Sequence, residues 1–166
     1  SIGNLLNAMC EVKQDYTIDL PDLHPKGFVK SFDQIVKFIQ EKNVVLLYLP
    51  IQSANQRILN LMNREYQIDE VDKKLLKLRK IFPELKIGTD IITGFPTETE
   101  EEFLDCFNFI KKHKFDWIYW HGYNIKEKAL ANKIEPKIDG GIIADRIKYA
   151  FERIPNIACY LNNYRK

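Results

Sequence analysis

The apolar residues follow two patterns along the chain: short apolar runs, which predict strands, and apolar residues at every third or fourth position, which predict helices. Four strands are predicted at 16–20, 43–49, 86–92 and 116–122, because these stretches are short, rich in β-branched or aromatic residues, and bounded by Pro, Gly or polar residues. The run at 43–49 is almost entirely apolar, which is typical of a strand buried on both faces of a parallel sheet.

Between the strands, apolar residues recur every three or four positions, which predicts amphipathic helices. These helices are expected at about 2–12, 32–39, 54–62, 68–81, 100–114 and 140–153. Ser31 and Ser53 are predicted N-caps, as is either Thr97 or Thr99. The segment 24–28 is expected to form a loop.

Strands that alternate with helices require crossover connections, so the fold class is α/β with a parallel sheet and helices outside. Four strands are few for a closed barrel, which usually has about eight. The chain of 166 residues is expected to be one domain, either a small open sheet or part of a larger barrel. It begins with Ser1 and not with Met, which favours a fragment, although processing also removes a Met.

Composition narrows the function classes only moderately. The net charge of +2 is too small to argue for nucleic-acid binding, and no apolar run approaches the roughly 20 residues of a membrane span. The three cysteines, Cys10, Cys106 and Cys159, lie far apart and have no metal-ligand spacing, so neither a cluster nor another metal is expected on this chain. An odd number of cysteines without a signal peptide favours reduced thiols, and therefore a cytoplasmic location.

The predicted carboxyl ends of the four strands share an unusual composition. They collect polar residues, Gly, Pro and aromatic residues at 22–25, 50–53, 93–96 and 120–123. Such ends meet at one rim of a parallel sheet, where ligands of this fold class bind. Gln52 and Ser53 offer hydrogen-bonding groups there, although Ser53 could instead cap a helix and Gln52 could simply face water.

The segment TDIITGFPTETEEEF at 89–103 joins a strand to an acidic helix start through Gly94-x-Pro96. Gly94 permits a conformation or a close approach that a side chain would block, and Pro96 ends the strand. The segment is either a plain connection or a turn that lines a ligand site.

Three segments together resemble one enzyme family, the radical S-adenosylmethionine methylthiotransferases. LPIQSANQRILNLMNREY at 49–66 is similar to their LPxQSG(S/A)xxxLxxMxRxY segment, and 89–103 is similar to their TDIIVGFPGETEEDF segment. DLHPKGF at 22–28 resembles a loop at their third barrel strand, and the likeness runs in order from about residue 3 to residue 125.

The resemblance implies strands three to six of a partial (β/α)6 barrel in an enzyme that methylthiolates a tRNA base or a ribosomal protein. It implies S-adenosylmethionine and a [4Fe–4S] cluster as cofactors of the full-length enzyme, and tRNA as the expected partner. By position, Gln52 and Ser53 would lie near the nucleoside and Ile91 under the adenine, with Gly94 allowing close approach. Trp120, on the strand at 116–122, would help to close the adenine pocket.

Departures from the family pattern define the alternatives. The cluster-binding CxxxCxxC motif, the family's N-terminal cysteine domain and its C-terminal nucleic-acid-binding domain have no counterpart in residues 1–166, and YNIKEKALA at 123–131 replaces the family's YSPRPGTxA. We therefore expect a fragment that is inactive alone and has no catalytic residue of its own.

The rival hypotheses are a non-catalytic α/β binding or interaction domain and a different radical enzyme family. The uncovered strand at 16–20 predicts a homodimer through the open barrel edge, while the substrate and sulfur donor stay open.

Overall fold

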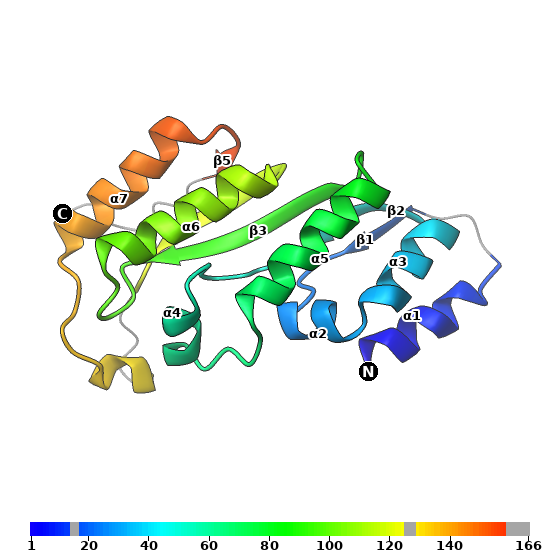
Figure 1. Ribbon diagram of the computed structural model, residues 1–166, viewed down its shortest axis with the longest axis horizontal. Helices are drawn as coiled ribbons and strands as arrows, with labels where there is room; N and C mark the ends of the chain where they lie inside the picture. The colour runs from blue at the N-terminus through cyan, green and yellow to red at the C-terminus, as the bar shows by residue number, and fades with distance from the viewer. Residues whose placement is uncertain (14–16, 125–128, 159–166) are drawn as a thin grey trace. The chain divides into compact units, whose positions relative to one another are not determined.

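A computed structural model describes residues 1–13, 17–124 and 129–158, in which helices and parallel strands alternate along the chain (Figure 1). The elements are, in order, α1 (Ile2–Cys10), β1 (Thr17–Leu20), α2 (Pro25–Lys30), α3 (Phe32–Glu41), β2 (Asn43–Tyr48), α4 (Gln56–Leu61), α5 (Ile68–Ile81), β3 (Lys86–Thr93), α6 (Glu100–His113), β4 (Trp117–Gly122), the 3-10 helix η1 (Leu130–Lys133), α7 (Gly140–Arg153) and β5 (Ile157–Ala158). The predicted α/β class is confirmed.

The strands follow chain order, β1-β2-β3-β4-β5, and the pairs β1–β2, β2–β3 and β4–β5 are parallel. The chain forms two compact units. Unit 1 comprises Ser1–Pro50 and Tyr66–Gly88, and unit 2 comprises Ile51–Glu65 and Thr89–Lys166. Strand β3 therefore begins in unit 1 and ends in unit 2.

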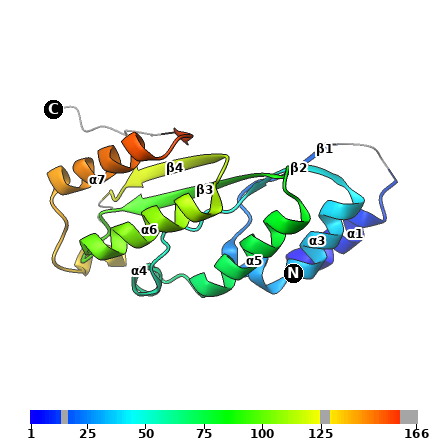
Figure 2. The ribbon, with the colours of Figure 1, turned by 45° about the horizontal axis from the view of Figure 1, so that its top comes forward.

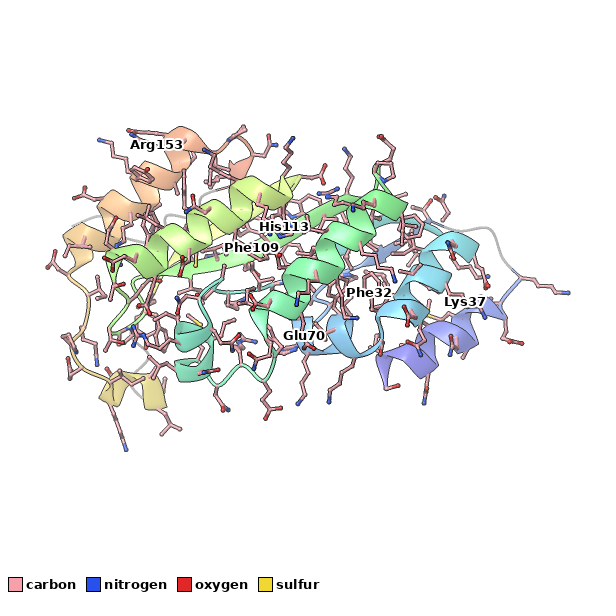
Figure 3. The ribbon with its side chains drawn as sticks, in the orientation of Figure 1. Phe32, Lys37, Glu70, Phe109, His113 and Arg153 are labelled. Carbon is pink, nitrogen blue, oxygen red and sulfur yellow. The ribbon has the colours of Figure 1, made fainter. Side chains whose placement is uncertain are left out.

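Unit 1 has its own apolar core beneath helices α2, α3 and α5. Its fully buried side chains include Phe28, Ile35, Phe38, Leu47, Val71 and Leu78. On α3, the ring of Phe32 is labelled in Figure 3. The ammonium groups of Lys74 and Lys77 from α5 lie over this ring, at 4.7 and 5.3 Å from its centroid. Aliphatic stems and rings thus cover the core while the charges stay at the surface.

Unit 2 is organised by the alternation of side chains along β3 and β4. Ile91 and Trp120 are fully buried, and the ring of Trp120 contacts Phe103 of α6 with centroids 6.0 Å apart. Helix α6 runs alongside the later part of β3 in both ribbon views (Figures 1 and 2). The opposite face of the two strands carries half-buried residues, namely Asp90, Ile92, Tyr119 and His121.

The end of α6 is fixed by aromatic packing within unit 2. Phe109 and His113, one helical turn apart on α6, have ring centroids 4.4 Å apart (Figure 3). His113 is buried, so this histidine belongs to the core and not to a surface site.

Three local predictions were wrong. Residues 25–28 of the segment predicted as a loop at 24–28 belong to α2, which begins with Pro25 at a position suited to proline. His24 caps this helix, and its Nδ1 accepts from the Lys26 amide. The N-cap of α4 is Asn55 and not Ser53, because the Asn55 side chain accepts from two helix amides. Strand β5 was missed, since two residues carry no periodicity.

The other expected helices and strands are present, with ends shifted by a few residues, and Ser31 and Thr99 occupy N-cap positions. Tyr16, where the first strand was expected to begin, and Cys159 lie outside the described residues. No helix in the part of the chain described is both long and apolar enough to cross a membrane.

Candidate functional site

Backbone hydrogen bonds of Gln52 hold the segment after β2 against β3. The Gln52 amide donates to the Asp90 carbonyl at 2.9 Å, and the Gln52 carbonyl accepts from the Ile92 amide at 2.8 Å. Gln52 has a φ of 65°, a conformation that is uncommon for a residue with a side chain. Because both backbone groups are used, only the half-buried side chain of Gln52 is left for a ligand.

Ser53 is fully buried and holds its own loop together. Its Oγ lies 3.5 Å from Cys106 Sγ and accepts from the Asn55 amide at 3.2 Å. Cys106 Sγ also accepts from the Ala54 amide, at 3.1 Å. Burial raises the pKa of the Cys106 thiol to about 11, so this cysteine stays protonated and unreactive. The Ser53 hydroxyl therefore orients the loop and does not reach a ligand.

The backbone conformation at position 94 and the nearby helix α7 both explain why this residue is a glycine. Its φ is 79°, and a Cβ at this position would lie 2.3 Å from Cγ1 of Ile143. Ile143 is buried in unit 2, and a Cβ on Gly122 would also approach it, at 3.0 Å. The space that a side chain at position 94 would need is thus filled by Ile143 of α7.

Ile91 and Trp120 are each fully buried on the face covered by α6. Their neighbours Ile92 and His121 lie on the opposite face and are half-buried. A ligand in unit 2 would meet Ile91 and Trp120 through the backbone only. Among the five residues proposed from sequence, Gln52 alone presents a partly accessible side chain.

A buried ion pair closes the turn between β3 and α6. Oε2 of Glu98 accepts from Thr93 Oγ1 at 2.9 Å, from the Gly94 amide at 2.7 Å and from Arg146 Nη1 at 2.9 Å. Arg146 also donates from Nε to Glu100 at 3.0 Å. Burial raises the pKa of Glu98, while the donated hydrogen bonds oppose that shift. No partner of Glu98 Oε1 is found among the described residues.

A second ion pair fixes the same turn from the side of α4. Arg57 makes two hydrogen bonds of 2.6 Å to the Glu102 carboxylate and donates to the Thr97 carbonyl at 2.8 Å. The hydrogen bonds from Arg57 hold the pKa of Glu102 below its usual range. Glu102 and Thr99 form a capping box at the start of α6.

A third pair lies on the open face of unit 2. Nε2 of His121 lies 3.1 Å from Oδ1 of Asp90, and the two side chains are 37% and 20% exposed. The His121 ring is stacked with that of Tyr119, with centroids 6.4 Å apart. From the sequence, His121 was included only within the strand-end segment 120–123, and Asp90 was not singled out.

The three polar pairs join residues that lie 31, 45 and 48 positions apart in the chain. No local sequence pattern predicts partners at such separations. In the sequence, Arg146 occupies a position that would be expected on the polar surface of an amphipathic helix. One signal was available: Glu98 and Glu102 follow a strand-ending glycine, where a buried carboxylate can accept from turn amides.

The described residues do not form a site for an iron–sulfur cluster. Cys10 and Cys106 are the described cysteines, and they belong to different units. Across the described ranges, no three His, Cys, Asp or Glu side chains come together as metal ligands. A [4Fe–4S] cluster needs several converging thiolates, which the described part of the chain does not supply.

A cavity of about 370 Å³ also lies within unit 2, away from these strand ends. Asp116 and Asn156, which precede β4 and β5, line it, so it sits at the amino ends of those strands. Lys111, Lys114 and Arg153 add positive charge around an apolar floor. The cavity is therefore separate from the turn at Gly94.

Curated relatives of this chain are methylthiotransferases. The sequence is 33% identical over 117 residues to the threonylcarbamoyladenosine tRNA methylthiotransferase of Bacillus subtilis, covering 69% of this chain and 26% of that protein. It is 30% identical over 154 residues to the tRNA-2-methylthio-N(6)-dimethylallyladenosine synthase of Fusobacterium nucleatum, covering 92% of this chain and 35% of that protein. The chain thus spans about a third of the relatives' length.

Solved structures show the same fold at low sequence identity. Coproporphyrinogen III oxidase from Escherichia coli, a radical SAM enzyme, is 18% identical with a TM-score of 0.66 over 91% of this chain and 35% of that one. SuiB from Streptococcus suis, in a structure with S-adenosylmethionine, is 19% identical with a TM-score of 0.57, over 95% of this chain and 36% of that one. The profile of the Radical SAM superfamily matches residues 5–110. The chain therefore belongs to the radical SAM superfamily, and its sequence is homologous to the tRNA and ribosomal-protein methylthiotransferases within it.

Proposed function

We propose that the chain is the C-terminal part of the radical domain of a methylthiotransferase that modifies an adenosine in tRNA. The observation that carries this proposal is the likeness to curated methylthiotransferases, at 30–33% identity over 69–92% of the chain. Both of these relatives are named for tRNA adenosine derivatives. Fold alone would not support the choice, because radical enzymes with this fold differ widely in their reactions.

We propose that the chain contributes the adenine side of an S-adenosylmethionine site in the whole protein. The Gln52 side chain is partly accessible, while Ile91, Gly94 and Trp120 would act through their backbone. Ser53 would shape the loop that carries Gln52. When bound to a full-length enzyme of this family, the cluster supplies the electron that cleaves S-adenosylmethionine.

The chain alone is proposed to be inactive, since its described cysteines do not form a cluster site. This is tested by incubating the purified chain anaerobically with S-adenosylmethionine and dithionite. We expect no 5′-deoxyadenosine above the level of the buffer control. Turnover by the chain itself would contradict the proposal of inactivity.

The partners and location of the whole protein are proposed on the same basis. We propose tRNA as the macromolecular substrate and the cytoplasm as the compartment. We also propose that the isolated chain forms a homodimer through β1, whose one described partner strand is β2. Light scattering over a concentration series tests this, and a strictly monomeric chain at high micromolar concentration would contradict it.

Activity of the whole protein is tested in its host. Nucleosides from tRNA of cells with the gene intact and with the gene disrupted are compared by mass spectrometry. We expect a 2-methylthioadenosine derivative to disappear on disruption. An unchanged nucleoside profile would contradict action on tRNA.

A further inference from the structure

We infer that Asp90 and His121 form a specificity-determining pair that binds the amino edge of a purine base on the open face of unit 2. This inference rests on the proposed function, because that function requires an adenine-type base at this domain. The two residues come from neighbouring strands, and His121 Nε2 lies 3.1 Å from Asp90 Oδ1. Both side chains remain partly exposed, at 37% for His121 and 20% for Asp90.

The geometry fixes which atoms are available. A carboxylate accepts hydrogen bonds only, so the His121 ring donates from Nε2 to Asp90, and in the neutral form of the ring Nδ1 is an acceptor. Within the described residues, neither Nδ1 of His121 nor Oδ2 of Asp90 has a hydrogen-bond partner. The pair therefore presents two acceptor atoms, Nδ1 of His121 and Oδ2 of Asp90.

An acceptor atom of this kind suits a ligand that offers an N–H donor. The exocyclic amino group of adenine is such a donor, and N6-substituted adenosines keep one N–H. The Tyr119 ring, stacked with His121 at 6.4 Å, adds an aromatic surface of the kind on which bases stack. The pair is flanked by Gln52, whose amide is bonded to the Asp90 carbonyl, and Gln52 brings a half-buried polar side chain.

The alternative explanation is a purely structural pair that ties β3 to β4. Partial exposure and unfilled acceptors weigh against it, because a structural pair inside a sheet is usually covered and fully bonded. The chain alone can distinguish the two explanations, since it holds every residue involved.

The test uses the imidazole NMR resonances of the whole chain, which has three histidines. His121→Gln assigns the His121 signal. Adenosine is titrated against purine riboside, which lacks the amino group and is otherwise the same. We expect adenosine to shift the His121 signal and to bind about tenfold more tightly than purine riboside, the difference given by one hydrogen bond to a charged group.

Asp90→Asn keeps His121 but replaces the carboxylate, and it should abolish the preference for adenosine. Asp145→Asn is the matched control, because it makes the same charge change at an exposed position on α7. Thermal unfolding of each variant confirms that the fold is kept. If Asp90→Asn does not fold, His121→Gln replaces it as the test variant. Its binding of adenosine and purine riboside is followed through ligand-induced shifts of the Tyr119 ring, and the preference for adenosine should again be lost.

Two further titrations identify the source of the base. S-adenosylhomocysteine represents the cofactor, and N6-dimethylallyladenosine represents the RNA target. A stronger response to one of them assigns the pair to that source. If saturating adenosine leaves the His121 signal unmoved, or if purine riboside binds equally well, the inference is overturned. Neither result affects the proposed activity, which is decided by tRNA nucleoside analysis.

Discussion

Arg146 of α7 reaches Glu98 in the turn between β3 and α6, with Nη1 2.9 Å from Oε2 and both side chains at most 8% exposed. This buried pair joins residues that lie 48 positions apart. Because Glu98 also accepts from the Gly94 amide, α7 fixes the backbone at the end of β3. The candidate rim of unit 2 is thus supported by a helix that the sequence placed correctly but whose role it did not reveal.

Replacing Arg146 by Met should destabilise the chain strongly. The change leaves Glu98 buried without its opposite charge, and the expected loss is about 3–5 kcal/mol of unfolding free energy. Urea denaturation measures it. Arg153→Met is the control, since Arg153 is half-exposed and its removal should cost less than about 1 kcal/mol.

The double change Arg146→Met with Glu98→Gln should recover part of this loss, because no buried charge is then left alone. Equal stability of Arg146→Met and the control variant would contradict the claim that the buried pair stabilises the fold.

The pH dependence of the Arg146→Met variant gives a second check. Burial raises the pKa of Glu98, so the penalty for its charge is avoided at low pH and grows as pH rises through the folded-state pKa. The loss in Arg146→Met should therefore be larger at neutral pH than in mild acid.

Gly94→Ala should be destabilising for two reasons that act together. The φ of 79° is unfavourable for alanine, and the new Cβ would lie 2.3 Å from Ile143 Cγ1. We expect a loss of about 2 kcal/mol or more by thermal or urea unfolding. Gly27→Ala is the matched control, because its Cβ would make an ordinary contact of 3.5 Å and helix α2 favours alanine.

Adding Ile143→Ala to Gly94→Ala tests the steric part of this explanation. The smaller side chain removes the clash and leaves only the cost of the backbone conformation, although it also opens space in the core. Gly94→Ala and Ile143→Ala should consequently be less damaging together than the sum of their separate effects. Strict additivity would show that the two residues do not compete for the same space.

Glu102 should contribute stability that is lost in acid. Arg57 lowers its pKa in the folded chain, so the contribution is complete above the unfolded value of 4.5 and disappears as pH falls through the folded-state pKa. Glu102→Gln removes this dependence. The difference in unfolding free energy between wild type and Glu102→Gln should shrink as pH falls below about 4.5. A difference that is constant across this range would contradict the assignment.

The purified chain should stay colourless after anaerobic treatment with iron and sulfide. Among the described residues, no group of three or more His, Cys, Asp or Glu side chains could hold a metal, and Cys106 is a buried neutral thiol. An absorbance scan and an iron assay check this. A stable brown protein with about four irons per chain would contradict the prediction.

Most of the fold could be predicted from local sequence. The apolar run at 43–49 specifies β2, the helical spacing at 68–81 specifies α5, and the strand–Gly–Pro–capped-helix order at 89–103 specifies β3 and α6. All four elements are confirmed. Short elements were harder, because α2 was mistaken for a loop and β5 has only two residues. Cap choice was uncertain where several polar residues compete, as at Ser53 and Asn55.

The candidate site was less predictable, because its interactions depend on contacts between distant residues. Gly94 was noticed for its lack of a side chain, but only the structure shows that Ile143 fills the space. The direction of a side chain across a strand also depends on one-residue register, so Ile91 and Trp120 are covered by helices while Ile92 and His121 lie on the open face. The assignment of Gln52, Ser53, Ile91, Gly94 and Trp120 to S-adenosylmethionine remains a prediction.

The most direct measurement of the central claim is the 2-methylthioadenosine content of tRNA in the host. Cells with the intact gene are compared with cells whose copy lacks the coding region for residues 89–103, which removes the turn held by Glu98 and Arg146. We predict that a 2-methylthioadenosine derivative is present with the intact gene, absent with the deletion, and restored by an intact second copy. A tRNA nucleoside profile that is identical in all three strains would contradict the claim that this chain belongs to a tRNA methylthiotransferase.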